Sequence, residues 1–316
     1  MFNYFQAIER NKIVGKFGVS YLDETLTGIM RGDLVIIGSR AGSGKSSLAN
    51  MIARANQKRH KIALFSLENF EDDLPMEQTY RYFIKNGGKY CSMREFASGE
   101  FLKRLNAEEK KQTARLIEQA CEFADHQYDG VNVYNRQSGF TVEELVKCML
   151  SEAEKGTELF IIDHLTYVDK LYSDESDVEH MTTLMRTIRQ IQDEKKVAVV
   201  GISHLRKPMS NVKEMPVIPS MDEFMGSSNI AKEATVCVLL APDDNGNKES
   251  IEKGITDLKK TWCCIRKNRY GGINNKAANL YFDLNSGEYR KSYVLFSVNY
   301  SGTKTEFLSL EDRGDV

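Results

Sequence analysis

The strongest constraint on the fold is the segment IGSRAGSGKSS, residues 37–47, which lies between an apolar run and a stretch of helical composition. It fits the phosphate-loop pattern G-x-x-x-x-G-K-[ST] from Gly44 onward, with Ser39 in place of the first glycine. The remaining glycines allow a tight turn, so successive backbone N–H groups can converge on phosphate oxygens. Lys45 is expected to reach the β- and γ-phosphates of ATP, and the Ser46 hydroxyl is expected to bind Mg²⁺.

A Gly/Ser turn that only caps a helix would have a similar composition. The strand before the loop, the helix after it and the Lys-Ser pair in register favour phosphate binding, which the N-terminal dipole of the helix would strengthen. The loop residues that we expect to bind ATP are Ser39, Arg40, Ala41, Gly42, Ser43, Gly44, Lys45, Ser46 and Ser47.

The composition is that of a globular domain with a full core: 316 residues, 41% of them apolar and 28% charged. No apolar run reaches the ~18 residues that a membrane helix requires, and the N-terminal stretch lacks the apolar centre of a signal peptide. The six cysteines have no paired spacing, which indicates reduced thiols and a cytoplasmic location. Because the net charge is −2, any contact with nucleic acid must come from local basic clusters.

Short β-rich runs alternate with segments of helical length. Several runs are continuously apolar, which is typical of strands covered on both faces of a sheet. The predicted fold class is therefore α/β, a P-loop NTPase with a mostly parallel central sheet flanked by helices and an added C-terminal antiparallel hairpin. The predicted strands are 34–38, 62–67, 131–134, 159–163, 197–203 and 236–240, the helices 45–59, 107–125, 141–155 and 177–194, and the hairpin strands 262–267 and 278–284.

Hydrolysis of ATP also requires carboxylates near the phosphates. Asp163 ends the apolar run LFIID, the Walker B arrangement, and is predicted to hold Mg²⁺ together with Ser46. Glu68 follows the strand after the phosphate-loop helix, at the sheet edge where α/β proteins bind ligands, and is a candidate base for the attacking water. The alternatives are a helix-capping role for Asp163 and a surface position at the start of the next helix for Glu68.

Taken in order, the motifs of the chain resemble those of the RecA-like motor domain of DnaB-type hexameric replicative helicases, especially the phage primase–helicase and Twinkle branch. The matching stretches span Gly18 to Gly272, most of the chain. They are GVSYLDETLTGIMRGDLVIIGSRAGSGKSS, ALFSLEN, FIIDHLTYVD, VVGISHLRKP, PSMDEFMGSSNIAKEAT and CIRKNRYGG.

The resemblance implies roles for residues whose types alone leave them open. Glu68 is similar to the catalytic glutamate of a Ser-Leu-Glu motif, and His204 to a γ-phosphate sensor, although a lone histidine is more often structural. Lys267 and Arg269 resemble the basic pair that enters the ATP site of the next subunit; a solvated basic hairpin is the alternative. Phe282 falls near the position of an aromatic residue that stacks on the adenine, whereas Ala241-Pro242 stands where an arginine is expected.

The resemblance also implies single-stranded DNA, a hexameric homo-oligomer and a primase or loader protein as partners, with ATP and Mg²⁺ as cofactors. A flexible charged loop is the alternative interpretation of the basic DNA-contacting segment. For a phage or organellar protein the location would be the host cytoplasm or an organelle matrix. The residues expected to contact DNA are Arg206, Lys207, Lys213, Gly226, Ser227 and Ser228.

We expect residues 1–16 to form an N-terminal arm or linker helix, 17–296 a RecA-like helicase ATPase domain and 297–316 a C-terminal tail. The predicted function is an ATP-dependent DNA helicase that hydrolyses ATP between the subunits of a ring and moves on single-stranded DNA. The alternatives are a RecA-like recombinase and a non-translocating ATPase such as a loader or regulatory ring. The family implies 5′ to 3′ movement.

Overall fold

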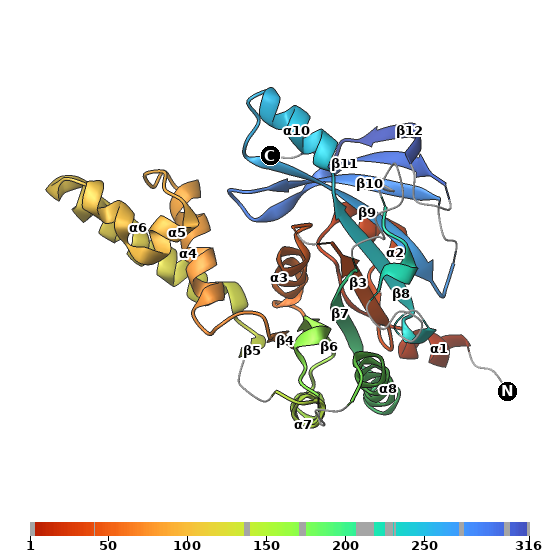
Figure 1. Ribbon diagram of the computed structural model, residues 1–316. Coiled ribbons are helices and arrows are strands. Elements are labelled where there is room, and N and C mark those ends of the chain that lie inside the picture. Colours follow the sequence, from red (N-terminus) through yellow and green to blue (C-terminus); the bar gives the residue numbers. More distant parts are fainter. Residues whose placement is uncertain are drawn as a thin grey trace.

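A ten-stranded sheet forms the centre of the computed structural model, in the order β12-β11-β10-β9-β8-β3-β7-β6-β4-β5 (Figure 1). A separate two-stranded sheet pairs β1 (Ile13–Gly15) with β2 (Ile29–Met30). The structure describes residues 4–40, 42–135, 140–170, 175–206, 218–224, 230, 232–271, 275–299 and 304–314.

The strands on one side of the large sheet are parallel, as the continuously apolar runs predict. They are β3 (Leu34–Ser39), β4 (Ile62–Ser66), β5 (Val131–Asn135), β6 (Leu159–Asp163), β7 (Ala198–His204) and β8 (Val236–Pro242). Since β3 pairs with β7 on one side and β8 on the other, the phosphate loop that follows Ser39 emerges near the middle of the sheet.

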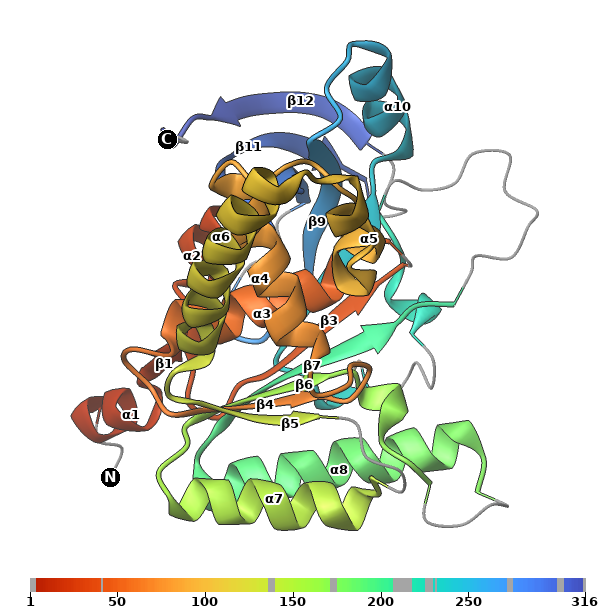
Figure 2. The ribbon, with the colours of Figure 1, turned by 90° about the vertical axis from the view of Figure 1, so that its left-hand side faces the viewer.

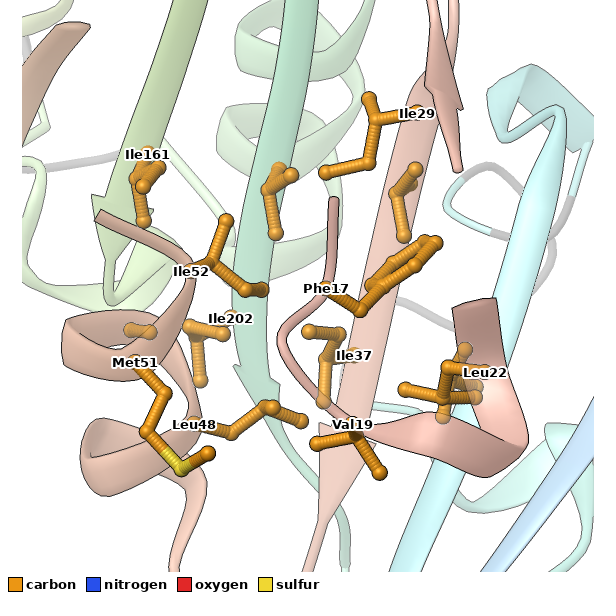
Figure 3. Packing of buried hydrophobic residues seen from close by; sticks show 14 of the residues in the cluster. Phe17, Val19, Leu22, Ile29, Ile37, Leu48, Met51, Ile52, Ile161 and Ile202 are labelled. Carbon is orange, nitrogen blue, oxygen red and sulfur yellow. The ribbon is translucent and has the colours of Figure 1, made fainter. Parts of the chain in front are cut away.

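The helices lie on both faces of this sheet (Figure 2). On one face, α3 (Lys45–Asn56) and α2 (Ser20–Leu26) pack against β3, and Leu48, Ile52 and Ile37 are fully buried there (Figure 3). On the other face, α7 (Val142–Glu154) and α8 (Asp177–Lys195) contribute to the core cluster that contains Leu34 and Ile36. Alternate residues of β3 thus lie in two different cores. Each fully buried aliphatic side chain contributes about 1.5–3 kcal/mol to the free energy of unfolding.

Several helix starts are fixed by side-chain caps. The Thr141 hydroxyl accepts the N–H of Glu144, and the Glu144 carboxylate accepts the N–H of Thr141, so a capping box opens α7. The same arrangement opens α8 with Ser176 and Glu179.

A helical insertion projects from the sheet between β4 and β5 (Figure 1). It contains α4 (Asp73–Lys85), α5 (Met93–Ser98), η1 (Glu100–Arg104) and α6 (Ala107–Asp125), followed by η2 (His126–Tyr128). Phe83, Phe96 and Phe101 form a small core of its own. Only α6 of this insertion was predicted, because α5 and η1 are short and α4 carries an interrupted apolar pattern.

The C-terminal part of the sheet is antiparallel and larger than the predicted hairpin. It contains β9 (Leu258–Asn268), β10 (Lys276–Asp283), β11 (Glu288–Val298) and the edge strand β12 (Lys304–Glu311), with α10 (Asp244–Glu252) between β8 and β9. The predicted hairpin is present as β9 and β10. The description of residues 297–316 as a tail was wrong for this segment, because Lys304 to Glu311 pair with β11.

The remaining described helical elements are α1 (Tyr4–Arg10), η3 (Leu165–Tyr167) and η4 (Met221–Glu223). In the described part of the chain, no helix is long and apolar enough to cross a membrane.

Candidate active site

The phosphate loop joins β3 to α3, and its conformation depends on glycine. Gly42 and Gly44 both have φ of 77°, in the left-handed region, and Gly44 is the residue before the first turn of α3. A Cβ on Gly44 would also lie 2.9 Å from the hydroxyl oxygen of Tyr289. That hydroxyl donates a hydrogen bond to the carbonyl of Ser43 at 3.1 Å, so β11 supports the loop.

Backbone contacts fix the start of the loop. The Arg40 N–H donates to the carbonyl of Leu240 on β8 at 3.3 Å, and the Ser43 N–H donates to the carbonyl of Arg40 at 3.3 Å. Ser39, which replaces the first glycine of the pattern, is fully buried at the end of β3. Ala41 lies outside the described residues.

Lys45 and Glu68 form an ion pair at the mouth of the loop. The ammonium nitrogen of Lys45 lies 3.3 Å from Oε2 of Glu68, which is about one-third exposed. The preceding N–H, of Leu67, donates to the carbonyl of Asp163 at 2.7 Å and ties the end of β4 to the end of β6. The structure therefore brings together the predicted phosphate-binding lysine and the predicted base.

Asp163 is almost fully buried beside these residues. The pKa of its carboxyl group is raised to about 6: burial is the main cause and the charge of Glu68 adds to it, while a hydrogen bond with Ser46 and the charge of Lys45 oppose the rise. Its Oδ1 atom has no hydrogen-bond partner among the described residues. A buried carboxylate oxygen without a partner, next to a serine hydroxyl, is suited to a divalent cation.

Mg²⁺ is the cation that this donor set fits. In nucleotide sites Mg²⁺ is held by one or two protein oxygens, while phosphates and waters complete its octahedron. Ser46 and Asp163 provide such a pair, and no cluster of three or more His, Cys, Asp or Glu side chains occurs among the described residues that would favour another metal.

Two histidines extend the site away from the phosphate loop. The rings of His164 and His204 meet edge to face with centroids 4.2 Å apart, and Nε2 of His164 lies 3.8 Å from Oε2 of Glu68. The pKa of His164 is lowered to about 3 by burial, then by His204 and Lys45. Burial and Lys45 also lower the pKa of His204, against the opposing effect of Glu68. The charges of Lys45 and Glu68 and the protonation of both histidines therefore influence one another.

His164 was missed as a site residue in the sequence analysis. It immediately follows the acidic residue at the C-terminal end of β6, the sheet edge where ligands bind in this kind of fold. That position was the available signal. Its Nδ1 atom lies 2.6 Å from the Thr166 hydroxyl, which fixes the orientation of the ring toward Glu68.

Lys267 and Arg269 lie toward the opposite end of the strands from the phosphate loop of their own subunit. On β8, Leu240 pairs with Ser39 of the parallel strand β3, and Val236 pairs with Asn268 of the antiparallel strand β9. The Arg269 N–H donates to Thr235, so Arg269 is about five strand residues, or ~16 Å, from the end of β3. Its exposed side chain does not belong to the site described above.

Lys267 is held in place by the chain beside it. Its ammonium group donates to the carbonyl of Lys232 at 3.1 Å, and burial is the main cause that lowers its pKa, followed by the charge of Arg269. The predicted basic pair is therefore close together and separated from the remaining predicted catalytic residues.

Phe282 lies in the core and not at an open surface. It is 7% exposed, meets Tyr289 edge to face, and has the Arg81 guanidinium 5.9 Å from its ring centroid. The predicted stacking on adenine is not supported by this position, because packed neighbours already surround the ring.

Arg206 is exposed just beyond β7 and two residues after His204. The other predicted DNA contacts, Lys207, Lys213, Gly226, Ser227 and Ser228, lie outside the described residues.

A phosphate loop after β3, an acid at the end of β6 and a glutamate after β4 define a RecA-like P-loop fold. Solved structures agree. One solved ATPase domain has a TM-score of 0.70 and 17% identity, and the match covers 90% of this chain and 94% of that one. A DnaB-like replicative helicase, studied with its interactions with primase, has a TM-score of 0.70 and 18% identity, covering 90% of this chain and 66% of that one.

The family can also be stated. The DnaB-like helicase C terminal domain family matches residues 16–291, and the chain belongs to it. The replicative DNA helicase DnaB of Geobacillus stearothermophilus is 24% identical over 264 residues, which are 81% of this chain and 52% of that protein. The chain thus spans about half the length of the curated relatives it matches. The predicted fold class and the resemblance to DnaB-type helicases are confirmed.

Proposed function

We propose that this chain is the motor of an ATP-dependent DNA helicase that works during replication. Its subunits form a ring, most simply a hexamer, hydrolyse ATP at their interfaces and move on single-stranded DNA to unwind duplex. One observation carries the proposal beyond family membership. The phosphate loop, Glu68 and Asp163 gather at one sheet edge, while Lys267 and Arg269 lie at the other, out of reach of the same nucleotide.

In the hydrolytic half of the site, Lys45 changes its ion-pair partner when ATP binds. Lys45 pairs with Glu68 at 3.3 Å, and the phosphates of ATP offer Lys45 a stronger anionic partner. Once Lys45 turns to the phosphates, Glu68 is free to accept a proton from the attacking water. Ser46 and Asp163 would hold Mg²⁺, which would supply positive charge to the phosphates when bound.

The second half of the site comes from a neighbouring subunit. Negative charge spreads over the phosphoryl oxygens in the transition state, and an arginine placed there accelerates hydrolysis by about 10³-fold or more. Arg269 cannot reach the ATP site of its own subunit across ~16 Å of sheet. In a head-to-tail ring, Arg269 of a neighbouring subunit can reach that site. Assembly then becomes a condition for hydrolysis, and each hydrolysis event acts on an interface.

The proposed DNA contacts begin in the sequence just after His204, the proposed nucleotide sensor. His204 ends β7 beside Glu68 and His164, and Arg206 follows two residues later. We propose that Arg206, Lys207, Lys213 and the backbone of Gly226, Ser227 and Ser228 hold DNA phosphates without reading the sequence. A primase or a loader protein is the expected protein partner, because one structural neighbour is described with its primase interactions.

The experiment that tests this function is duplex unwinding by the purified chain on forked DNA, with ATP and Mg²⁺. Forks with only a 5′ tail, only a 3′ tail or both tails separate the two directions of movement, and Glu68→Gln is the inactive control. We expect unwinding that requires ATP and a 5′ tail. ATP hydrolysis indifferent to DNA, with no unwinding, would instead identify a loader or regulatory ATPase, and open filaments with strand exchange would identify a recombinase.

A further inference from the structure

A bidentate ion pair links the phosphate loop to a segment distant in sequence. Nη2 of Arg40 lies 3.0 and 3.1 Å from the two carboxylate oxygens of Glu223, and Nε lies 3.2 Å from Oε2. Their side chains are only 16% and 12% exposed. Arg40 belongs to the loop that binds the phosphates, whereas Glu223 ends η4, three residues before Gly226 of the predicted DNA-contacting segment.

Backbone hydrogen bonds close this link into a circuit through the end of β7. The carbonyl of Glu223 accepts the N–H of Arg206 at 2.7 Å, and the carbonyl of Ser39 accepts the N–H of Leu205 at 3.0 Å. Since Ser39 precedes Arg40 in the chain, the phosphate loop, the residues just after His204 and η4 are joined in one ring of contacts.

Close packing makes this circuit stiff. The fully buried ring of Phe224, next to Glu223, touches Gly38 so closely that a Cβ there would lie 2.5 Å from a ring carbon. Leu205 also forms a β-bridge with Phe224. A shift of η4 therefore cannot be absorbed by loose side chains and must displace Phe224, the end of β7 or the carboxylate that holds Arg40.

Stability alone does not explain a pair of this kind. When two charges leave water, the desolvation cost offsets most of their attraction, so a partly buried ion pair adds little net stability. Its planar, two-point geometry instead fixes the relative position of the two groups that it joins.

We propose that the Arg40–Glu223 pair transmits the occupancy of the DNA-binding segment to the phosphate loop, which makes Glu223 a positioning residue for ATP-site coupling. The inference rests on the proposed function. Bound DNA holds η4 in the position in which Glu223 keeps Arg40 of the phosphate loop in place for the nucleotide. By linkage, bound nucleotide favours the same position of η4 and strengthens binding of the strand by an equal factor.

Glu223→Gln tests the pair selectively. Oε1 of Glu223 also accepts the N–H of Ser220 at 2.8 Å, and the glutamine oxygen can keep this bond and with it the cap of η4. The glutamine amide would then face the Arg40 guanidinium, donor against donor, so the two-point contact is lost. Asp222→Asn is the matched control, because it removes one charge from the same turn at a carboxylate that contacts Ser220 and not Arg40.

The measurement is the dissociation constant of a fluorescent non-hydrolysable ATP analogue with Mg²⁺, with and without saturating oligo-dT. In the wild type and in Asp222→Asn we expect DNA to tighten nucleotide binding by a factor of about 5 or more. In Glu223→Gln we expect a factor below about 2, and because the factor compares each protein with and without DNA, it does not depend on the DNA-free affinity of the variant.

The outcomes separate the two proposals. A wild-type protein that unwinds forked DNA but whose nucleotide affinity ignores DNA would overturn this inference alone, whereas a protein that also fails to unwind would overturn the proposed function and this inference with it. A wild-type factor retained by Glu223→Gln, or lost equally in Asp222→Asn, would overturn the inference alone. If Glu223→Gln does not fold, as judged by circular dichroism, Glu223→Asp decides. Its shorter carboxylate should give an intermediate factor, and an unchanged factor would overturn the inference.

Discussion

Replacing Asp163 with asparagine should make the nucleotide-free protein more stable. The carboxylate is almost fully buried, one of its oxygens has no partner among the described residues, and burial raises its pKa from 3.8 to about 6. Above pH 6 the folded protein must keep this group charged in a poorly solvated position. The difference of about two pH units corresponds to ~3 kcal/mol of lost stability, which Asp163→Asn should recover in large part.

The sign of this effect gives its pH dependence. A carboxyl group whose pKa is raised by folding lowers stability at high pH, and the penalty disappears as pH falls from the folded value of about 6 toward the ordinary value of 3.8. The stability difference between Asp163→Asn and wild type should therefore be largest above pH 7 and should shrink on acidification to pH 4–5. Urea denaturation of both proteins at equal concentration, across this pH range, measures it.

Asp33→Asn is the matched control, because Asp33 is also buried and also has a raised pKa caused mainly by burial. Its carboxylate, however, accepts the N–H of Met30 and the hydroxyl of Thr235, each at 2.8 Å. Removal of that charge should weaken both bonds and give no gain. Stabilisation by Asp163→Asn that is absent above pH 7, or that persists unchanged at pH 4, would refute the reasoning.

Added nucleotide should remove most of the stability advantage of Asp163→Asn. A ligand at 100 times its dissociation constant stabilises the folded protein by about 2.7 kcal/mol, and wild type should gain this from Mg²⁺ and a non-hydrolysable ATP analogue. The variant lacks the carboxylate that we propose to hold Mg²⁺ and should gain far less. The two denaturation midpoints should then approach each other, which is the expected behaviour of a group retained for function at a cost in stability.

Further substitutions test separate parts of the site. Glu68→Gln should keep nucleotide binding but lower hydrolysis by about 10²-fold or more, measured by steady-state phosphate release; near-normal turnover would reject its role as base. Lys45→Ala should lose nucleotide affinity in equilibrium titration, and unchanged affinity would contradict phosphate contact. Tyr289→Phe removes the hydrogen bond to Ser43 and should cost about 0.5–1.5 kcal/mol of stability and raise KM for ATP more than it lowers kcat; unchanged KM would contradict support of the loop.

The fold was predictable where local patterns and tertiary position agree. β3, β4, β6 and β8 are continuously apolar and buried on both faces, so their strands were predicted to within two residues at each end. α4 and β12 were missed for opposite reasons. α4 has an interrupted apolar pattern that only packing within the insertion stabilises, and β12 is an edge strand with exposed apolar residues such as Phe307 and Leu310.

The site was predictable where a motif carries the chemistry. Lys45, Ser46, Glu68 and Asp163 were predicted from phosphate-loop spacing and from strand ends, and the structure brings them together. Contacts that depend on tertiary packing were not predictable from those patterns. Tyr289 under the loop and Glu223 against Arg40 are 246 and 183 residues from their partners, and no local pattern relates such positions.

Sites shared between subunits are the central claim, and mixed rings test it most directly. An Arg269→Ala subunit has an intact phosphate loop, and a Lys45→Ala subunit has an intact Arg269. In an equal mixture about one quarter of the head-to-tail interfaces would pair the two intact halves, so ATPase activity should recover toward about one quarter of wild type, although neither variant is active alone. Subunit exchange is verified separately by energy transfer between labelled subunits. Full activity of Arg269→Ala by itself, or no recovery at any mixing ratio despite exchange, would contradict the account.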